Sequence, residues 1–168
     1  GTLAGTTKLM AIIPGGGVSY PGSLTPVGST LYFVAGDAST GSELWKSDGT
    51  AKNTMMVKNI NPATHGYPDS LTAVGSTLYF SANDGANGFE LWKSNGTDLG
   101  TVMVKNIGSL ASSSYPKMLT AVGDTLYFMA NDGIAGTELW RSDGTESGTV
   151  NVIDLYLGAL AGVKAILN

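Results

Sequence analysis

The stretch ELWKSDGT, from Glu43 to Thr50, decides how this chain is built, because it occurs three times. The second copy, ELWKSNGT, begins at Glu90, and the third, ELWRSDGT, begins at Glu138. The first residues of the copies therefore lie 47 and 48 positions apart. A catalytic motif normally occurs once, whereas self-similarity at a fixed period is typical of repeat architectures. The octet thus predicts a repeated structural unit.

The similarity extends well beyond the octet. Residues 67–107 and 115–155 are identical at about 26 of 41 aligned positions, and residues 20–60 form a more divergent copy. In the second copy, four short runs rich in aromatic and β-branched residues lie at 70–74, 77–82, 89–94 and 101–107, bounded by Gly, Asn and Asp. Such runs predict β-strands, and no stretch has the 3.6-residue period of an amphipathic helix. The expected fold class is therefore all-β.

The lengths of the connections predict how the strands are arranged. Three short loops within each copy favour antiparallel hairpins, and the longest connection, such as residues 108–117, joins one copy to the next. A four-stranded antiparallel meander with a longer exit is typical of a propeller blade. We therefore expect one repeat domain over residues 1–168, with three four-stranded blades near 20–60, 67–107 and 115–155.

The octets and the Gly-Thr pairs that follow them resemble the ELWxxDGT repeats of large bacterial proteins that are predicted to be secreted or displayed on the cell surface. The resemblance covers all three copies and implies a propeller-type repeat, export from a bacterial cell and no enzyme chemistry. Two positions depart from the pattern. Asn95 replaces the motif aspartate, and Asn53 replaces the second glycine of the first copy.

Both ends of the chain predict an extra strand. Residues 1–13, and within them Thr6–Ile13, align with the fourth strands, and residues 156–168 contain a segment, Val163–Asn168, that aligns with the first strands. Known propellers close with four or more blades, so three blades and two extra strands should not close alone. We expect a piece of a longer array, or a ring or fibre completed by other copies of the chain, because unpaired sheet edges recruit strands.

Composition excludes several classes of partner. The net charge is −4, and the nine Lys and Arg residues are scattered, so neither nucleic acid nor an anionic membrane surface is expected to bind. No apolar run reaches the roughly 20 residues needed to cross a bilayer, so no membrane insertion is expected. The absence of cysteine excludes disulfides, thiolate metal sites and cysteine nucleophiles.

The octet permits a structural and a ligand-binding interpretation. As ligand-binding residues, its acids would hold a glycan and its indoles would stack on it. As structural residues, the tryptophans would be buried between blades, with tight turns at Asp48-Gly49, Asn95-Gly96 and Asp143-Gly144. We favour the structural interpretation, because the same residues recur at one position of every blade. The candidate ligand-binding residues are Glu43, Trp45, Glu90, Trp92, Glu138 and Trp140.

A second candidate site lies in the loop between the second and third strands of each copy. Asp37, Asp84 and Asp132 are equivalent there, and each is followed six positions later by the octet glutamate. Ca²⁺ prefers several oxygen ligands, and one Asp with one Glu supplies few carboxylates. These aspartates are candidate Ca²⁺ ligands. The alternative, which we favour, is that they cap Asx turns. No catalytic residue is proposed, since the single histidine, His65, has no triad partners that can be identified.

These features favour a non-catalytic, exported β-propeller module that acts as a binding or structural unit of a larger assembly, at the cell surface or outside the cell. The expected partners are copies of itself or the rest of a longer array, and glycans are a further candidate. One alternative is a carbohydrate-binding propeller lectin with equivalent sites between blades. Others are a fragment of a larger enzyme or adhesin, or a fibre subunit.

Overall fold

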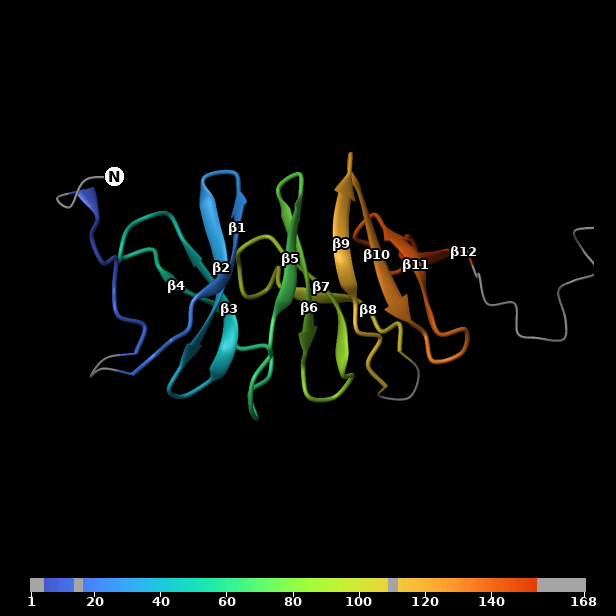
Figure 1. Cartoon of the computed structure of the whole chain (residues 1–168), viewed down its shortest axis with the longest axis horizontal. Coiled ribbons are helices and arrows are strands. Elements are labelled where there is room, and N and C mark those ends of the chain that lie inside the picture. Colours follow the sequence, from blue (N-terminus) through green and yellow to red (C-terminus); the bar gives the residue numbers. More distant parts are fainter. Residues whose placement is uncertain (1–4, 14–16, 109–111, 154–168) are drawn as a thin grey trace, which may run out of the picture.

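The chain forms three four-stranded antiparallel sheets, one within each sequence repeat. The computed structural model describes residues 5–13, 17–108 and 112–153 (Figure 1). The strands of the three sheets are, in order, β1 (Gly22–Val27), β2 (Thr30–Asp37), β3 (Gly41–Ser47) and β4 (Met55–Lys58); β5 (Asp69–Val74), β6 (Thr77–Asn83), β7 (Phe89–Ser94) and β8 (Val102–Lys105); β9 (Lys117–Val122), β10 (Thr125–Asn131), β11 (Thr137–Ser142) and β12 (Val150–Ile153). The all-β expectation is confirmed, and the described residues include no α-helix.

Each sheet is a meander in which spatial order follows chain order. The first hairpin of each sheet turns through a two-residue Gly-Ser or Gly-Asp loop, and Gly28, Gly75 and Gly123 have φ values of 57°, 57° and 58°. A glycine with positive φ at the first central position matches the type II′ hairpin turn, whose twist suits antiparallel strands. The first strands also carry a β-bulge near their start, where Ser23, Ser70 and Met118 have positive φ.

The three sheets lie side by side along the longest axis of the molecule (Figure 1). β1 contacts β5, and β5 contacts β9, so equivalent first strands are neighbours. Two apolar clusters fill the spaces between the sheets. Tyr32 and Leu44 of the first sheet meet Phe80 and Trp92 of the second. At the second interface, Tyr79 and Leu91 take the place of Tyr32 and Leu44, facing Phe128 and Trp140.

Because a middle sheet contacts neighbours on both faces, its strands are apolar on both sides. β6 has five consecutive buried residues, Leu78–Ala82, instead of the alternation typical of a sheet with one wet face. The bulk that the sequence places on both faces of these strands is explained by this stacking. The two clusters repeat the same contacts, so the repeat period of the sequence is also the period of the core.

The N-terminal segment differs from the expectation. Residues 5–13 form no strand, although the alignment predicts a fourth strand there. The other fourth strands pair with the third strand of their own sheet, as β4 pairs with β3, and no third strand pairs with residues 5–13 in the described structure. Instead, Ile12 packs against Phe33, Ala35 and Trp45 of the first sheet. The strand predicted within 156–168 lies outside the described residues.

Candidate functional site

The octet glutamate of the first sheet is fully buried and is bound by backbone amides of the segment that leads to the second sheet. Glu43 Oε2 accepts a hydrogen bond from the Ile60 N–H at 3.0 Å, and Oε1 accepts one from the Gly66 N–H at 2.7 Å. A side chain on Gly66 would collide with this carboxylate. The glutamate therefore fixes the connecting segment against β3.

Glu90 does the same for the next connection with more donors. Its Oε2 accepts bonds from the Ile107 N–H at 2.8 Å and the Ser114 hydroxyl at 2.6 Å. Its Oε1 accepts bonds from the N–H groups of Gly108 and Ser114, each at 3.1 Å. Glu138 is buried at the equivalent position of β11. Glu43 and Glu90 thus each hold a link between sheets through main-chain N–H donors of that link.

Burial decides the titration of these two carboxyl groups. Loss of water around Glu43 raises its pKa above the ordinary value, and the backbone donors of Ile60 and Gly66 oppose this only in part. Burial likewise raises the pKa of Glu90 against its bonds from Ser114 and Ile107. A raised carboxyl pKa is often a sign of an acid catalyst, but here each carboxylate is already surrounded by structural donors.

The octet tryptophans are packed inside, as the structural interpretation predicts. Trp45, Trp92 and Trp140 are buried in equivalent positions, each paired across the hairpin with a phenylalanine of the second strand. The indole N–H of all three is buried and has no hydrogen-bond acceptor among the residues that the structure describes. The predicted burial is confirmed for all three rings. Only Trp92 and Trp140 lie between two sheets, however, because Trp45 is on the outer face of the first sheet, where Ile12 packs against it.

The end of the octet shapes the connection between the third and fourth strands. Asp48 Oδ1 accepts a bond from the Thr50 N–H at 2.9 Å, and Gly49 has a φ of 91°. A buried hydroxyl pair, Ser47 with Thr54 at 2.7 Å, closes the loop, and the other two copies repeat it. Asn95 and Asp143 accept the equivalent bonds from Thr97 and Thr145, so each of these residues caps its loop. The connection spans residues 48–54, however, so it is longer than the predicted tight turn.

The octet lysines link neighbouring sheets. Lys46 Nζ donates to the Gly96 carbonyl of the second sheet at 2.7 Å, and Lys93 Nζ donates to the Gly144 carbonyl of the third at 2.8 Å. Arg141 is the equivalent residue of the third sheet. Within the described part of the chain, it donates no hydrogen bond to another sheet. The basic residue of the octet therefore bonds the following sheet in the first two copies, and Arg141 makes no such bond in the described structure.

The candidate Ca²⁺ ligands form Asx turns in the loops between the second and third strands. Asp37 Oδ1 accepts bonds from the N–H groups of Ser39 and Thr40. Asp84 and Asp132 make equivalent bonds in their own loops. No group of three or more His, Asp or Glu side chains is placed to hold a metal ion within residues 5–13, 17–108 and 112–153.

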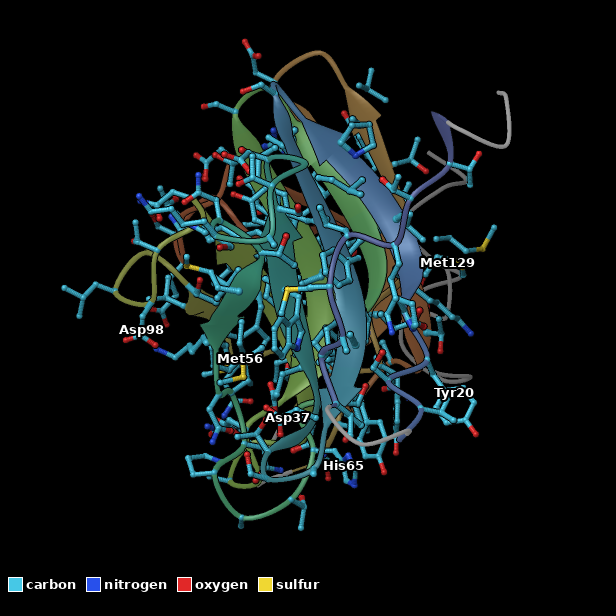
Figure 2. The ribbon with its side chains drawn as sticks, turned by 90° about the vertical axis from the view of Figure 1, so that its left-hand side faces the viewer. Tyr20, Asp37, Met56, His65, Asp98 and Met129 are labelled. Atoms are coloured by element: carbon cyan, nitrogen blue, oxygen red, sulfur yellow. The ribbon has the colours of Figure 1, made fainter. Side chains whose placement is uncertain are left out.

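A row of tyrosines is a candidate site that the sequence interpretation missed. Tyr20, Tyr67 and Tyr115 are exposed, and their φ values of 44°, 45° and 47° place them in the left-handed region, which is uncommon for bulky residues. A cavity of about 260 Å³ is lined by Tyr20, Tyr67, Asp37 and His65; Figure 2 labels three of these. The Tyr-Pro pair that opens each repeat was the signal available in the sequence.

The outer face of the third sheet exposes residues that are buried at both internal interfaces. Leu139 is 37% exposed, whereas the equivalent Leu44 and Leu91 are at 0%. The same contrast holds for the first and fourth strands, where Val122 and Val152 are exposed and their counterparts in the other sheets are buried. In the described structure, this face has the composition of an interface and no sheet against it.

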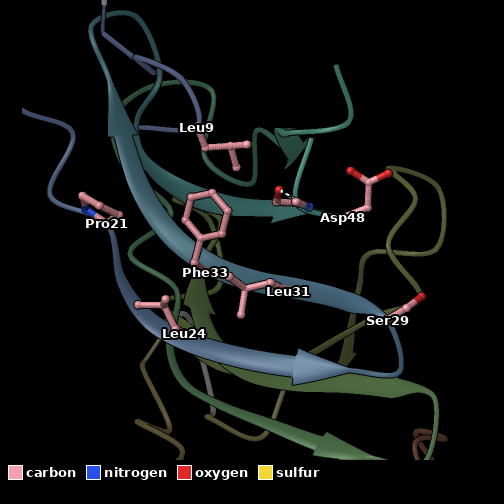
Figure 3. Close-up of a pocket in the computed structure, with 9 residues that line it drawn as sticks. Leu9, Pro21, Leu24, Ser29, Leu31, Phe33 and Asp48 are labelled. Atoms are coloured by element: carbon pink, nitrogen blue, oxygen red, sulfur yellow. Dashed lines mark hydrogen bonds between the residues drawn. The ribbon is translucent and has the colours of Figure 1, made fainter. Parts of the chain in front are cut away.

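The opposite end of the molecule has an apolar cavity over the first sheet. It measures about 420 Å³ and lies between Leu24 of β1, Leu31 and Phe33 of β2, and the turn at Asp48 and Gly49 (Figure 3). Leu9 of the N-terminal segment forms its remaining wall. The two end faces therefore differ in shape. The outer face of the third sheet exposes apolar side chains, whereas the outer face of the first sheet contains a cavity.

No family model matches the sequence, and a search of curated proteins finds no match. Among the described residues, no helix has the length and apolar character needed to span a membrane.

Proposed function

We propose that this chain is a non-catalytic module of β-propeller type that acts as a binding and structural unit of a larger assembly. The observation that carries the proposal is the outer face of β9–β12. It presents to solvent the positions that are buried wherever one sheet of this chain meets the next. An apolar face with that composition is expected to be covered in the functioning molecule.

The chemistry of the octets supports a structural role. The groups that most resemble catalytic or ligand-binding residues, Glu43 and Glu90, already have their oxygens occupied by main-chain donors. The tryptophans are buried, and the lysines link one sheet to the next. The resemblance to the ELWxxDGT repeats further supports export to the surface or exterior of a bacterium, with other repeats of the same kind as partners.

The mass of the particle in solution tests this proposal. We expect sedimentation of the complete chain at micromolar concentrations to give a species larger than the 17.2 kDa of one copy. Hydrogen exchange should then protect the amides of β11 nearly as well as those of β7. A monomer whose β11 exchanges much faster than β7 contradicts the proposal.

A carbohydrate-binding role is the second candidate, and the tyrosine row favours it. Exposed aromatic rings give sugars an apolar surface, and backbone strain of this kind concentrates at functional positions. Tyr67 is stacked on His65 at 4.8 Å, beside the cavity that contains Asp37. The site would take one or two sugar units between neighbouring repeats.

A panel of mono- and oligosaccharides tests that role through shifts of the melting temperature. Tyr67→Gly removes the ring and accepts the positive φ, so it should abolish a sugar-dependent shift without straining the backbone. Leu99→Ser, which changes an exposed residue of another loop, should retain the shift. Absence of any shift, or an equal shift in both variants, would count against a lectin.

A further inference from the structure

We propose that the outer face of β9–β12 binds the outer face of β1–β4 in a second copy of this chain, with Tyr127 entering the cavity beside Gly49. The inference rests on the proposed function and specifies its partner. It follows from the two sheet–sheet interfaces inside the chain, which supply a template for a third.

The template begins with a tyrosine and a glycine. At the first interface, the Tyr32 hydroxyl lies so close to Gly96 that a β-carbon there would collide with it. At the second, the Tyr79 hydroxyl lies against Gly144 in the same way. The next tyrosine in this series is Tyr127, which is only half-buried. Tyr32 and Tyr79 each face a glycine of the following sheet, and no described sheet follows β9–β12 to offer such a glycine to Tyr127.

A glycine that could face Tyr127 is present on the first sheet, at the other end of the molecule. Gly49 is equivalent to Gly96 and Gly144, yet the position of its missing β-carbon has nothing within 4 Å. The open space beside it is the 420 Å³ cavity, which falls in the range of about 300–1,000 Å³ for cavities that hold small molecules. An aromatic side chain therefore has room to enter where the two internal interfaces already hold one.

Hydrogen bonds across the two internal interfaces predict the same alignment of the two copies. Thr25 Oγ1 donates to the Leu71 carbonyl at 3.4 Å, and Thr72 Oγ1 donates to the Leu119 carbonyl at 3.2 Å. By equivalence, Thr120 would donate to the Leu24 carbonyl of the second copy. Arg141 would likewise donate to the Gly49 carbonyl, as the two octet lysines do to their glycines. Arg141 would also approach the negative charge of Asp48, which lines the cavity.

The apolar residues of the receiving face match those of the internal interfaces. Phe33, Ala35 and Trp45 occupy the positions that Phe80, Ala82 and Trp92 hold in the second sheet. Ile12 covers part of this face in the monomer, but residues 5–8 are exposed. Docking displaces this segment where it overlaps the incoming sheet, so residues 5–13 compete with the second copy.

The contact joins two different faces, so it is heterologous and can continue into a ring or a fibre. A symmetric contact of β9–β12 with itself would not supply the Gly49 cavity. It would also bring the Arg141 side chains of both copies into one interface, without Asp48. Charge and shape therefore both favour the head-to-tail arrangement.

Single-cysteine variants of the complete chain test this arrangement, because the sequence contains no cysteine. Thr120→Cys and Leu24→Cys both change exposed residues. With a short bis-maleimide, we expect a covalent dimer when the two variants are mixed and little dimer from either variant alone. Adding Leu139→Asp to the Thr120→Cys chain should abolish the dimer, whereas Ile134→Asp, in the exposed loop between β10 and β11, should leave it unchanged.

Arg141→Glu provides a second disruption that leaves the apolar face intact. It would place a negative charge beside Asp48, so the dimer yield should fall even if Leu139→Asp perturbs folding, which an unfolding curve would reveal. An assembly that forms without this cross-link overturns the head-to-tail inference but leaves the proposed function standing. Strong dimer from Thr120→Cys alone also overturns the inference. A monomer at all concentrations rejects both proposals.

Discussion

Replacing Glu90 by glutamine tests the role assigned to the octet carboxylate. Glu90 is fully buried and accepts four hydrogen bonds, two at each oxygen, from Ile107, Gly108 and Ser114. Glutamine retains one of the two oxygens and replaces the other by an NH₂ group. The two donors that bonded the replaced oxygen then face another donor. A buried donor left without an acceptor costs about 1–3 kcal/mol. Two such donors, offset partly by removal of a buried charge, predict a loss of about 2–4 kcal/mol in the free energy of unfolding.

Urea denaturation followed by tryptophan fluorescence measures this loss. Glu146→Gln is the matched control, since it removes the same charge from an exposed position. We expect it to change stability by less than about 0.5 kcal/mol. Equal stability of the two variants would refute the argument that the carboxylate fixes the connection between sheets.

The pH dependence of the Glu90→Gln effect gives an independent check on the direction of the pKa shift of Glu90. Burial raises the pKa of Glu90 above its ordinary value of 4.5, so the folded protein holds the proton more tightly than the unfolded chain. The resulting stabilisation is fully present below about pH 4.5 and is lost as the pH rises through the folded-state pKa. The penalty of Glu90→Gln should therefore be larger at low pH and shrink toward neutrality. A penalty that grows with pH would mean that the hydrogen bonds outweigh burial.

Two further predictions concern packing. Trp92→Phe should cost clearly less than Trp92→Ala, for which about 3–5 kcal/mol is expected, because phenylalanine retains most of the buried apolar volume and the indole N–H bonds no acceptor in the described part of the chain; equal costs in urea unfolding would reveal a missed polar contact. Gly96→Ala should destabilise more than Gly75→Ala, since both glycines have positive φ but only Gly96 faces the Tyr32 hydroxyl. Equal melting temperatures for the two glycine variants would argue against the close approach of the tyrosine.

The repeat, the strands and the local turn chemistry could be predicted from the amino-acid sequence. Octet spacing, strand composition and the Asx-Gly pairs are local signals, because hairpin geometry depends on residues close together in the chain. The burial of Trp92 was also predictable, since a large apolar residue recurring at one position of every unit is best explained by packing. The structure confirms three four-stranded antiparallel sheets, whereas the closure of a propeller remains a proposal.

The contacts of the octet glutamates and the difference between the two ends of the molecule depend on how the sheets pack together. The donors to Glu43 lie 17 and 23 residues further along the chain, and spacing alone does not specify such a bond. The N-terminal segment aligned with a fourth strand, yet it forms none, because a strand needs a neighbour with free main-chain groups as well as a suitable sequence. The exposed Leu139 and the buried Leu91 lie in nearly the same local sequence, TELWRS and FELWKS. Burial is a property of the neighbouring sheet, so no local pattern could distinguish them.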